Sequence, residues 1–230
     1  MKLAIVGYGR MGRLIERFAP EHGFTVAAKL DELNNSSFEG ITKEAFEGVD
    51  VAIDFSVPSA VVENVERLAK LGVNVVVGTT GWLPKMAHVR GVVEKNGTGL
   101  VWSPNYSVGV NAFFRLVVEA ARLLSNEAEY EAWAYEIHHS AKQDAPSGTL
   151  LKLVEEMKSA GWARAVDVAS NRAGTIPGTH EIGFDSAADT ITLRHTARNR
   201  EGFAHGALKA AAWLVGKKGF HEFGEILFHS

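Results

Sequence analysis

The first eighteen residues constrain the fold of this chain more than any other stretch. KLAIVG, residues 2–7, is a continuous apolar run of strand length, and it passes directly into GYGRMGRLIERFA. In that second segment Met11, Leu14, Ile15 and Phe18 recur at helical spacing. A strand, a tight turn and a helix in this order are typical of a parallel α/β sheet.

Three glycines occupy the turn in the pattern G-x-G-x-x-G, at Gly7, Gly9 and Gly12. The first permits the tight turn, the second lets backbone approach a pyrophosphate, and the third lets helix pack on strand. Free amides at the helix start then face the phosphates. The next apolar run, FTVAAKLD, ends in Asp31, about 20 residues beyond the loop, where a carboxylate can bind an adenosine ribose. An ordinary tight loop would explain the glycines alone, but the whole pattern predicts dinucleotide binding.

Charges after the second strand favour NADH over NADPH. Asp31 and Glu32 disfavour a 2′-phosphate electrostatically. NADPH stays open as the alternative, because Arg10, Arg13 and Lys29 are cations close to the same loop.

Strand-like and helix-like segments continue to alternate up to GLVWSPN, which ends at residue 105. VDVAIDFS and VNVVVGTTG resemble strands, whereas PSAVVENVERLAKLG and PKMAHVRGVVEKNG resemble helices. This alternation predicts a Rossmann-like doubly wound parallel sheet, which binds ligands at the carboxyl ends of its strands. Any one residue there could be a plain turn residue, but as a group they predict cofactor contacts: Phe55, Ser56, Gly78, Thr79, Thr80, Gly81, Ser103, Pro104, Asn105 and Tyr106.

The second half of the chain has a different pattern. NAFFRLVVEAARLLS, residues 111–125, predicts an amphipathic helix capped by Asn111, with a buried stripe of Phe113, Leu116, Val117, Ala120 and Leu124. EYEAWAYEIHH alternates with a period of two, and HEIGFD and DTITLRHTAR continue in that style. FAHGALKAAAWLVGKKG predicts a last helix that ends in glycine. We therefore expect a second, α+β domain with a mixed or antiparallel sheet.

EIHHSAKQDAPSGT, residues 136–149, combines proton carriers with anion-binding groups. Alternation along the strand puts His138 on the side of Glu136 and His139 on the side of Ile137. The strand is expected to end there, and Lys142 adds a positive charge in the segment that follows.

A helix is expected to begin just after this charged segment. Ser147 is the predicted N-cap of the helix GTLLKLVEEMKSAG. Free amides of Gly148 and Thr149, together with the Thr149 hydroxyl, would attract a carboxylate or phosphate. The histidines and the lysine could each be ordinary surface residues. Taken together, these groups predict a site for a small acid that receives a proton.

The composition of the chain excludes several functional classes. None of the 230 residues is cysteine, which excludes disulfides, a thiolate nucleophile and cysteine-ligated metal, and we predict no metal site. A formal charge of −3 argues against nucleic-acid or acidic-membrane surfaces. No apolar run approaches the roughly 18 residues of a transmembrane helix, and LAIVG is too short for a signal peptide. We expect a cytoplasmic protein with a small-molecule partner.

Six segments, in order along the chain, resemble the dihydrodipicolinate reductase family, also called 4-hydroxy-tetrahydrodipicolinate reductase. They are GYGRMGR, GTTG, SPNYSVGVN, EIHHSAKQDAPSGT, RAGTIPGTHEIGF and HTARNREGFAHGAL. The resemblance spans nearly the whole chain, and its H-H-x-x-K-x-D-A-P-S-G-T element is far more specific than a glycine loop. It implies a dinucleotide-binding domain of residues 1–109 and 206–230, and a substrate-binding and oligomerisation domain of residues 110–205 within a homotetramer.

The resemblance also implies a reaction, in which NADH or NADPH reduces a cyclic dicarboxylate imine in lysine and diaminopimelate biosynthesis. His138 would be the general acid and Lys142 its cationic partner, and whether His139 or Lys142 shares proton donation stays open. Substrate contacts are implied for His139, Ser147, Gly148 and Thr149. Cofactor contacts are implied for Gly7, Tyr8, Gly9, Arg10, Met11, Gly12, Asp31, Gly78, Thr79, Thr80, Ser103, Pro104, Asn105 and Tyr106.

The chain departs from the family pattern between its second and third strands. DELNNSSFEGITKEAFEGVD is shorter than the usual connection, and Glu32 lies where NADPH-binding members often carry a cation. Two other functions remain as hypotheses. One is a different two-domain amino-acid dehydrogenase, and the other is a non-catalytic NAD-binding sensor, against which the intact HHxxK element counts.

Overall fold

The computed structural model describes residues 1–228, and the chain divides into two compact units. Unit 1 combines residues 1–108 with the chain from residue 201 onward, and unit 2 is residues 109–200. The expected boundary between residues 205 and 206 lies inside helix α6 (Glu201–Leu214). The two compact units divide just before this helix, so all of α6 lies in unit 1. Among the described residues, no helix is both long enough and apolar enough to cross a membrane.

Unit 1 is built on a six-stranded sheet in the order β10-β5-β4-β3-β1-β2, and every strand pair in it is parallel. The chain adds β2 on one side of β1 and β3 on the other, which is the strand-order reversal of a doubly wound sheet. This arrangement confirms the predicted Rossmann-like architecture. The strands are β1 (Lys2–Val6), β2 (Thr25–Leu30), β3 (Val51–Asp54), β4 (Asn74–Val77), β5 (Gly99–Trp102) and β10 (Gly219–Glu222).

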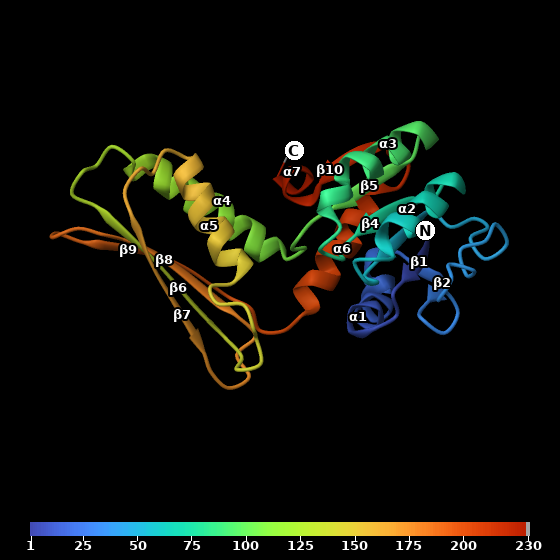
Figure 1. The fold of residues 1–230 in the computed structure, drawn as a ribbon, viewed down its shortest axis with the longest axis horizontal. Coiled ribbons are helices and arrows are strands. Elements are labelled where there is room, and N and C mark those ends of the chain that lie inside the picture. The colour runs from blue at the N-terminus through green and yellow to red at the C-terminus, as the bar shows by residue number, and fades with distance from the viewer. Residues whose placement is uncertain (229–230) are drawn as a thin grey trace. The chain divides into compact units, whose positions relative to one another are not determined.

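Helices cover both faces of this sheet, as Figure 1 shows. One core cluster joins α1 (Arg10–Phe18) and α6 to the sheet through residues such as Ile15 and Leu208. The cluster on the other face contains residues of α2 (Val61–Lys70) and α3 (Met86–Asn96), such as Val65 and Val89. The shorter helices of the unit are η1 (Ala19–His22), η2 (Leu83–Lys85) and α7 (Phe223–Phe228).

The sixth strand of unit 1 was not predicted from the sequence. β10 has only four residues, all half-buried, so it has no alternation of polar and apolar residues to identify it. It forms because it pairs with β5, whose residues lie more than a hundred positions earlier in the chain.

Unit 2 contains a four-stranded mixed sheet in the order β7-β6-β8-β9. β6 and β7 are parallel, whereas β6 and β8, and β8 and β9, are antiparallel, which confirms the predicted mixed sheet. Helices α4 (Val108–Leu124) and α5 (Gly148–Ser159) lie on one face of this sheet (Figure 1). The strands are β6 (Glu131–His138), β7 (Val166–Arg172), β8 (Thr179–Asp185) and β9 (Thr190–Thr196).

Helix α4 corrects two predictions. It begins at Val108, so Asn111 lies inside the helix and is not its cap. The helix extends further because Val110 continues the buried stripe, which runs through Phe113, Val117 and Ala121. Leu116 was expected on this stripe, but it is 59% exposed on the outer side of the helix.

Candidate active site

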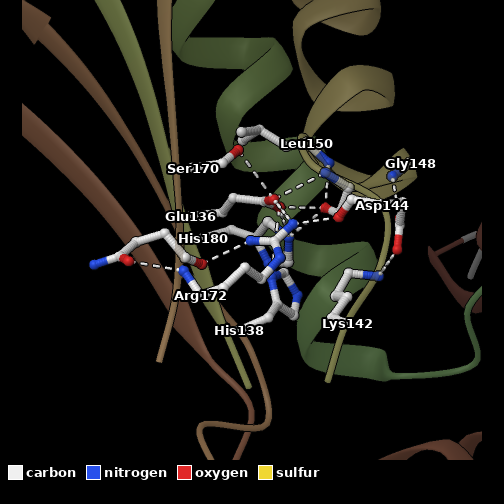
Figure 2. Close-up of polar contacts among 11 residues, drawn as sticks. Glu136, His138, Lys142, Asp144, Gly148, Leu150, Ser170, Arg172 and His180 are labelled. Carbon is white, nitrogen blue, oxygen red and sulfur yellow. Dashed lines mark hydrogen bonds and ion pairs between the residues drawn. The ribbon is translucent and has the colours of Figure 1, made fainter. Parts of the chain in front are cut away.

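Strand pairing gathers five polar residues on the helix-covered face of the unit 2 sheet, close to where β6 ends. Glu136 of β6 pairs with Ser170 of β7 and with His180 of β8. One row further along, His138 pairs with Arg172. Directly paired residues point to the same face of a sheet, so these side chains converge, as Figure 2 shows.

Glu136 is the centre of this group and has no exposed surface. Its carboxylate accepts hydrogen bonds from the Ser147 amide at 2.8 Å, from Arg172 Nη2 at 2.8 Å and from Ser170 Oγ at 3.2 Å. The Ser147 hydroxyl donates to it as well. Burial opposes ionisation, but these hydrogen bonds outweigh burial and hold the pKa of Glu136 below its ordinary value. Glu136 is therefore a buried, charged carboxylate at neutral pH.

Two histidines face the same carboxylate oxygen. His138 Nδ1 lies 3.6 Å from Glu136 Oε2, and His180 Nε2 lies 3.4 Å from it. Burial is the largest cause of the lowered pKa of both imidazoles, and the neighbouring His138 helps to bring the pKa of His180 to about 4. For His138, the positive charges of Lys142 and Arg172 add to burial, while Glu136 opposes both. Both rings are therefore neutral at neutral pH in the free protein.

The His138 ring packs directly against the backbone of a glycine, Gly178. A Cβ atom on Gly178 would lie 2.9 Å from both Cδ2 and Nε2 of His138, and the φ angle of Gly178 is +154°. A side chain at this position would displace the imidazole, so the backbone before β8 forms one wall of the site.

The start of helix α5 lies beside this group. Ser147 Oγ accepts a hydrogen bond from the Leu150 amide at 3.3 Å, which confirms Ser147 as the N-cap. Lys142 Nζ donates to Asp144 Oδ1 at 2.7 Å, and the Gly148 amide donates to Asp144 Oδ2 at 3.4 Å (Figure 2). A carboxylate group thus lies between the lysine and the helix amide, so these two groups are close enough to bind one carboxylate together.

The remaining predicted substrate residues flank this group. His139 follows the last residue of β6 and is half-buried, and its carbonyl accepts a hydrogen bond from the Lys142 amide at 3.1 Å. Thr149 is half-buried in the first turn of α5. Their contacts with a substrate stay predictions.

Three residues of the group were missed by the sequence analysis, and Glu136 was noted only as a member of the alternating strand. Arg172 and Ser170 lie on β7, which has almost no buried residues and therefore no alternation to indicate a strand. His180 lies in the predicted strand HEIGFD, where a polar residue facing the helices was an available signal.

A metal ion is not assigned to this cluster. Ligand atoms of Glu136, His138 and His180 lie within 4.8 Å of one another. Both oxygens of Glu136, however, already accept hydrogen bonds from Ser147 and Arg172. The absence of a metal stays a prediction.

The glycine loop of unit 1 fits a dinucleotide. Gly7 has a φ angle of +93°, and a Cβ on it would lie 2.4 Å from the Phe55 carbonyl oxygen. A Cβ on Gly12 would lie 2.5 Å from the Gly7 oxygen, whereas a Cβ on Gly9 would meet nothing within 4 Å. No side chain caps α1, and the space beside its N-cap Gly9 is open. This is the space that a pyrophosphate needs.

The other loop residues differ in what they present. Tyr8 donates from its hydroxyl to Glu16, whose carboxylate also accepts from Lys29 Nζ at 2.9 Å. Arg10 begins α1, and Met11 packs partly buried against the core. Lys29 is therefore already paired with a carboxylate at the edge of the loop.

Asp31 directly follows β2, as predicted for a ribose-binding carboxylate. Its Oδ1 accepts a hydrogen bond from the Leu33 amide at 2.8 Å, which holds the side chain in the turn after the strand. Its contact with a cofactor stays a prediction.

The carboxyl ends of β4 and β5 form a pocket that joins four of the predicted cofactor residues. Thr79, Thr80, Ser103 and Pro104 line it together with Trp82, Leu83 and Trp102. The Thr79 hydroxyl donates to the buried Asp54 at 3.0 Å, so it supports the loop from below.

Three further predicted cofactor residues serve the loops themselves. The Tyr106 hydroxyl is buried and lies 3.0 Å from the carbonyls of both Val77 and Val101. The Asn105 carbonyl accepts from Ser103 Oγ at 2.8 Å. Gly78 lies under the Phe55 ring, which would meet a Cβ there at 2.2 Å. These contacts shape the loops, and cofactor contacts of the three residues stay predictions.

Comparison with solved structures first shows which proteins share this fold. Its fold is shared with a dihydrodipicolinate reductase from Paenisporosarcina sp. TG-14 with bound dipicolinate, at a TM-score of 0.84 and 20% identity over 98% of this chain and 99% of that one. An aspartate dehydrogenase from Thermotoga maritima matches at a TM-score of 0.51 and 12% identity, over 94% of this chain and 97% of that one. Both structures share with this chain the fold of a parallel dinucleotide-type sheet joined to a second, mixed sheet.

Sequence comparison then gives the family. Residues 1–106 match the model for the N-terminus of dihydrodipicolinate reductase, and residues 109–227 match the model for its C-terminus. A protein of Christiangramia forsetii named 4-hydroxy-tetrahydrodipicolinate reductase is 36% identical over 99% of this chain and 98% of its own length. One of the same name from Methanoregula boonei is 38% identical over 98% and 97%. The chain belongs to the dihydrodipicolinate reductase family, which confirms the resemblance.

Proposed function

We propose that this protein uses NADH or NADPH to reduce 4-hydroxy-tetrahydrodipicolinate to tetrahydrodipicolinate, a step of lysine and diaminopimelate biosynthesis. The observation that carries the proposal is the match to one reductase family over nearly the full chain. The site supports it, because a buried histidine, a lysine and a helix N-terminus suit a doubly anionic ring that takes up a proton.

Each part of the site has a task in this reaction. Bound NAD(P)H supplies the hydride. His138 donates the proton, so that the ring gains one hydride and one proton, and Lys142 lies close enough to hold or help protonate the ring. The amides of Gly148 and Thr149 bind a substrate carboxylate in place of Asp144. Ser147 caps the start of this helix, and His139 lies at the edge of the substrate site.

The first experiment measures steady-state rates with enzymatically generated substrate and each cofactor in turn. His138→Gln and Lys142→Ala are expected to lose most of kcat, because a positioned acid contributes about 10²- to 10⁴-fold. Their Kd for NADH should stay close to that of the unaltered protein. Lys158→Ala, at the far end of α5, is the control. Full rates in both site variants would contradict the proposal.

We propose NADH as the preferred cofactor. Lys29, the cation on β2 that could meet a 2′-phosphate, is paired with Glu16. Asp31 and Glu32 add negative charge where that phosphate would lie. A higher kcat/KM with NADPH than with NADH would contradict this preference.

We also propose that the protein forms a homotetramer in the cytoplasm. The family resemblance implies the tetramer, and the half-buried side chains on the helix-free face of the unit 2 sheet suit such an assembly. The chain has no cysteine and therefore needs no disulfide bond, which agrees with a reducing compartment such as the cytoplasm.

The two alternative functions are not favoured. An amino-acid dehydrogenase would show ammonia-dependent turnover, and the aspartate dehydrogenase is a relative in fold alone. A non-catalytic sensor would bind NADH without turning over any imine. The same rate measurements distinguish all three.

A further inference from the structure

The proposed reaction gives Glu136 no step, although its Oε2 lies 3.6 Å from Nδ1 of the proposed proton donor His138. A carboxylate without exposed surface is costly unless its charge is fully hydrogen-bonded. Glu136 meets that condition with donors from two other elements, because Ser147 belongs to the start of α5, and Ser170 and Arg172 belong to β7. The carboxylate therefore ties three separate elements together at the end of β6.

The hydrogen bonds of Glu136 join the two parts of the predicted substrate site, the end of β6 with His138 and the start of α5. His138 is two residues beyond Glu136 on the same strand and face. Ser147, held by its amide and its hydroxyl, immediately precedes the Gly148 and Thr149 amides. Apolar packing of Leu150 and Leu153 against Ala132 and Ala134 also holds α5 on β6. Among the described hydrogen bonds, however, those of Glu136 are the ones that join this helix start directly to β6.

We propose that Glu136 is a positioning residue for proton transfer, which fixes the carboxylate-binding start of α5 against β6 and keeps a negative charge beside His138. This inference rests on the proposed function, since it assigns Glu136 to the same proton transfer. Glu136 does not touch the substrate in this proposal, because Ser147 and Arg172 cover its oxygens.

The charges that face His138 act in opposite directions. Glu136 and Asp144 stabilise the imidazolium, whereas Lys142 and Arg172 disfavour it. His180 packs edge-on against the ring at a centroid distance of 5.0 Å. Removing the charge of Glu136 and removing that of Arg172 should therefore shift the titration of His138 in opposite senses, although the two residues are hydrogen-bonded to each other.

The test is the pH dependence of kcat/KM, which falls as pH rises through the pKa of the required acid. Glu136→Gln keeps the shape of the side chain and is expected to move this fall to lower pH by about one unit. It should also lower kcat at pH 7 about 10-fold or more, because the NH2 group of glutamine cannot accept the hydrogen bonds that one carboxylate oxygen accepts, which loosens the helix start. Arg172→Gln should move the fall to higher pH. Glu131→Gln, on an exposed residue of the same strand, is the control and should change neither.

A third variant separates geometry from charge. Glu136→Asp keeps the charge but is one methylene shorter. We therefore expect kcat to fall, while the pH at which kcat/KM declines stays close to that of the unaltered protein. If Glu136→Gln does not fold, Arg172→Gln still decides, because a shift to lower pH or no shift would overturn the proposal. Activity losses without opposite shifts would also overturn it, since they indicate a purely structural residue. If the unaltered protein does not reduce the substrate at all, the proposed function fails, whereas normal turnover without the shifts removes only this inference.

Discussion

At the scale of single residues, the protonation state of His138 is the central feature, because an imidazole with a lowered pKa has to carry a proton to act as a general acid. The pKa of the free imidazole is lowered chiefly by burial, with Lys142 and Arg172 adding to the effect. A general acid has to carry its proton when the substrate reacts. Two substrate carboxylates bound beside His138 would favour the imidazolium, so substrate binding itself is expected to load the acid with its proton.

The pH profiles of kcat/KM and of kcat are expected to differ. In the proposed mechanism His138 acts in its protonated form, so activity is expected to fall as pH rises through its pKa. The fall in kcat/KM reports the free protein and should be centred below the ordinary histidine value of about 6.5. The fall in kcat reports the substrate complex and should lie at higher pH. Steady-state rates between pH 5 and pH 9, on the order of one point per half unit, check this expectation. If kcat/KM and kcat declined at the same pH, this expectation would be contradicted.

Asp31 is the second residue that can be tested alone. A carboxylate after the second strand binds the two ribose hydroxyls of NADH but repels a 2′-phosphate. Asp31→Ser should therefore raise the KM for NADH about 10-fold or more, on the scale of one lost charged hydrogen bond, and change the KM for NADPH much less. Glu47→Gln, an exposed acid in the segment between β2 and β3, is the control. Equal changes for both cofactors would mean that Asp31 only supports the turn through Leu33.

At the scale of elements, helix α5 depends on Ser147, the N-cap that precedes its first residue. The hydroxyl caps the Leu150 amide and donates to the buried Glu136. Losing a cap costs about 1 kcal/mol, and leaving a buried carboxylate short of a donor costs about 1–3 kcal/mol.

Ser147→Ala should therefore lower the free energy of unfolding by about 2 kcal/mol or more. Urea unfolding at pH 7 gives the measurement. Ser140→Ala is the control, because that exposed hydroxyl makes one weak hydrogen bond among the described residues, to the Gly174 carbonyl at 3.3 Å. The prediction is wrong if both variants lose the same stability.

The elements also show where sequence reasoning succeeds and where it stops. Local patterns were enough for the glycine loop, five of the six parallel strands of unit 1, the Ser147 cap and the common face of Glu136 and His138. The partners of Glu136 could not be found in this way. Arg172 and Ser170 reach it from 36 and 34 residues away, on a strand formed by pairing and not by any pattern of its own.

Helix α4 shows the same limit at a helix boundary. Asn111 is a good capping residue in isolation, but the burial of Val110 extends the helix to Val108. Tertiary packing overrides the local capping preference here.

At the scale of the whole molecule, the helix-free face of the unit 2 sheet is the feature to test. Trp133, Tyr135 and Ile137 alternate with the buried residues of β6 and point to this face, where they are half-buried. α4 and α5 lie on the other face (Figure 1). Aromatic and branched side chains in one row favour association of like subunits.

Tyr135→Asp is expected to dissociate the proposed tetramer, because a charge in the centre of an apolar interface is poorly solvated. Light scattering coupled to size exclusion measures the mass. Leu116→Asp, on the exposed side of α4, serves as the control and should leave the mass unchanged. A monomeric unaltered protein would contradict the homotetramer.

The pairing of β6 with its two neighbours has a final consequence for how this protein is made. A slip of one residue would turn Glu136 and His138 away from α5 and bring Tyr135 and Ile137 beneath the helix, in a chain that could still be compact. Such a product would keep its ability to hold a nucleotide in unit 1 while having no acid in place. After refolding from denaturant, the ratio of catalytic activity to bound NADH therefore counts the molecules whose second sheet has assembled in the correct alignment.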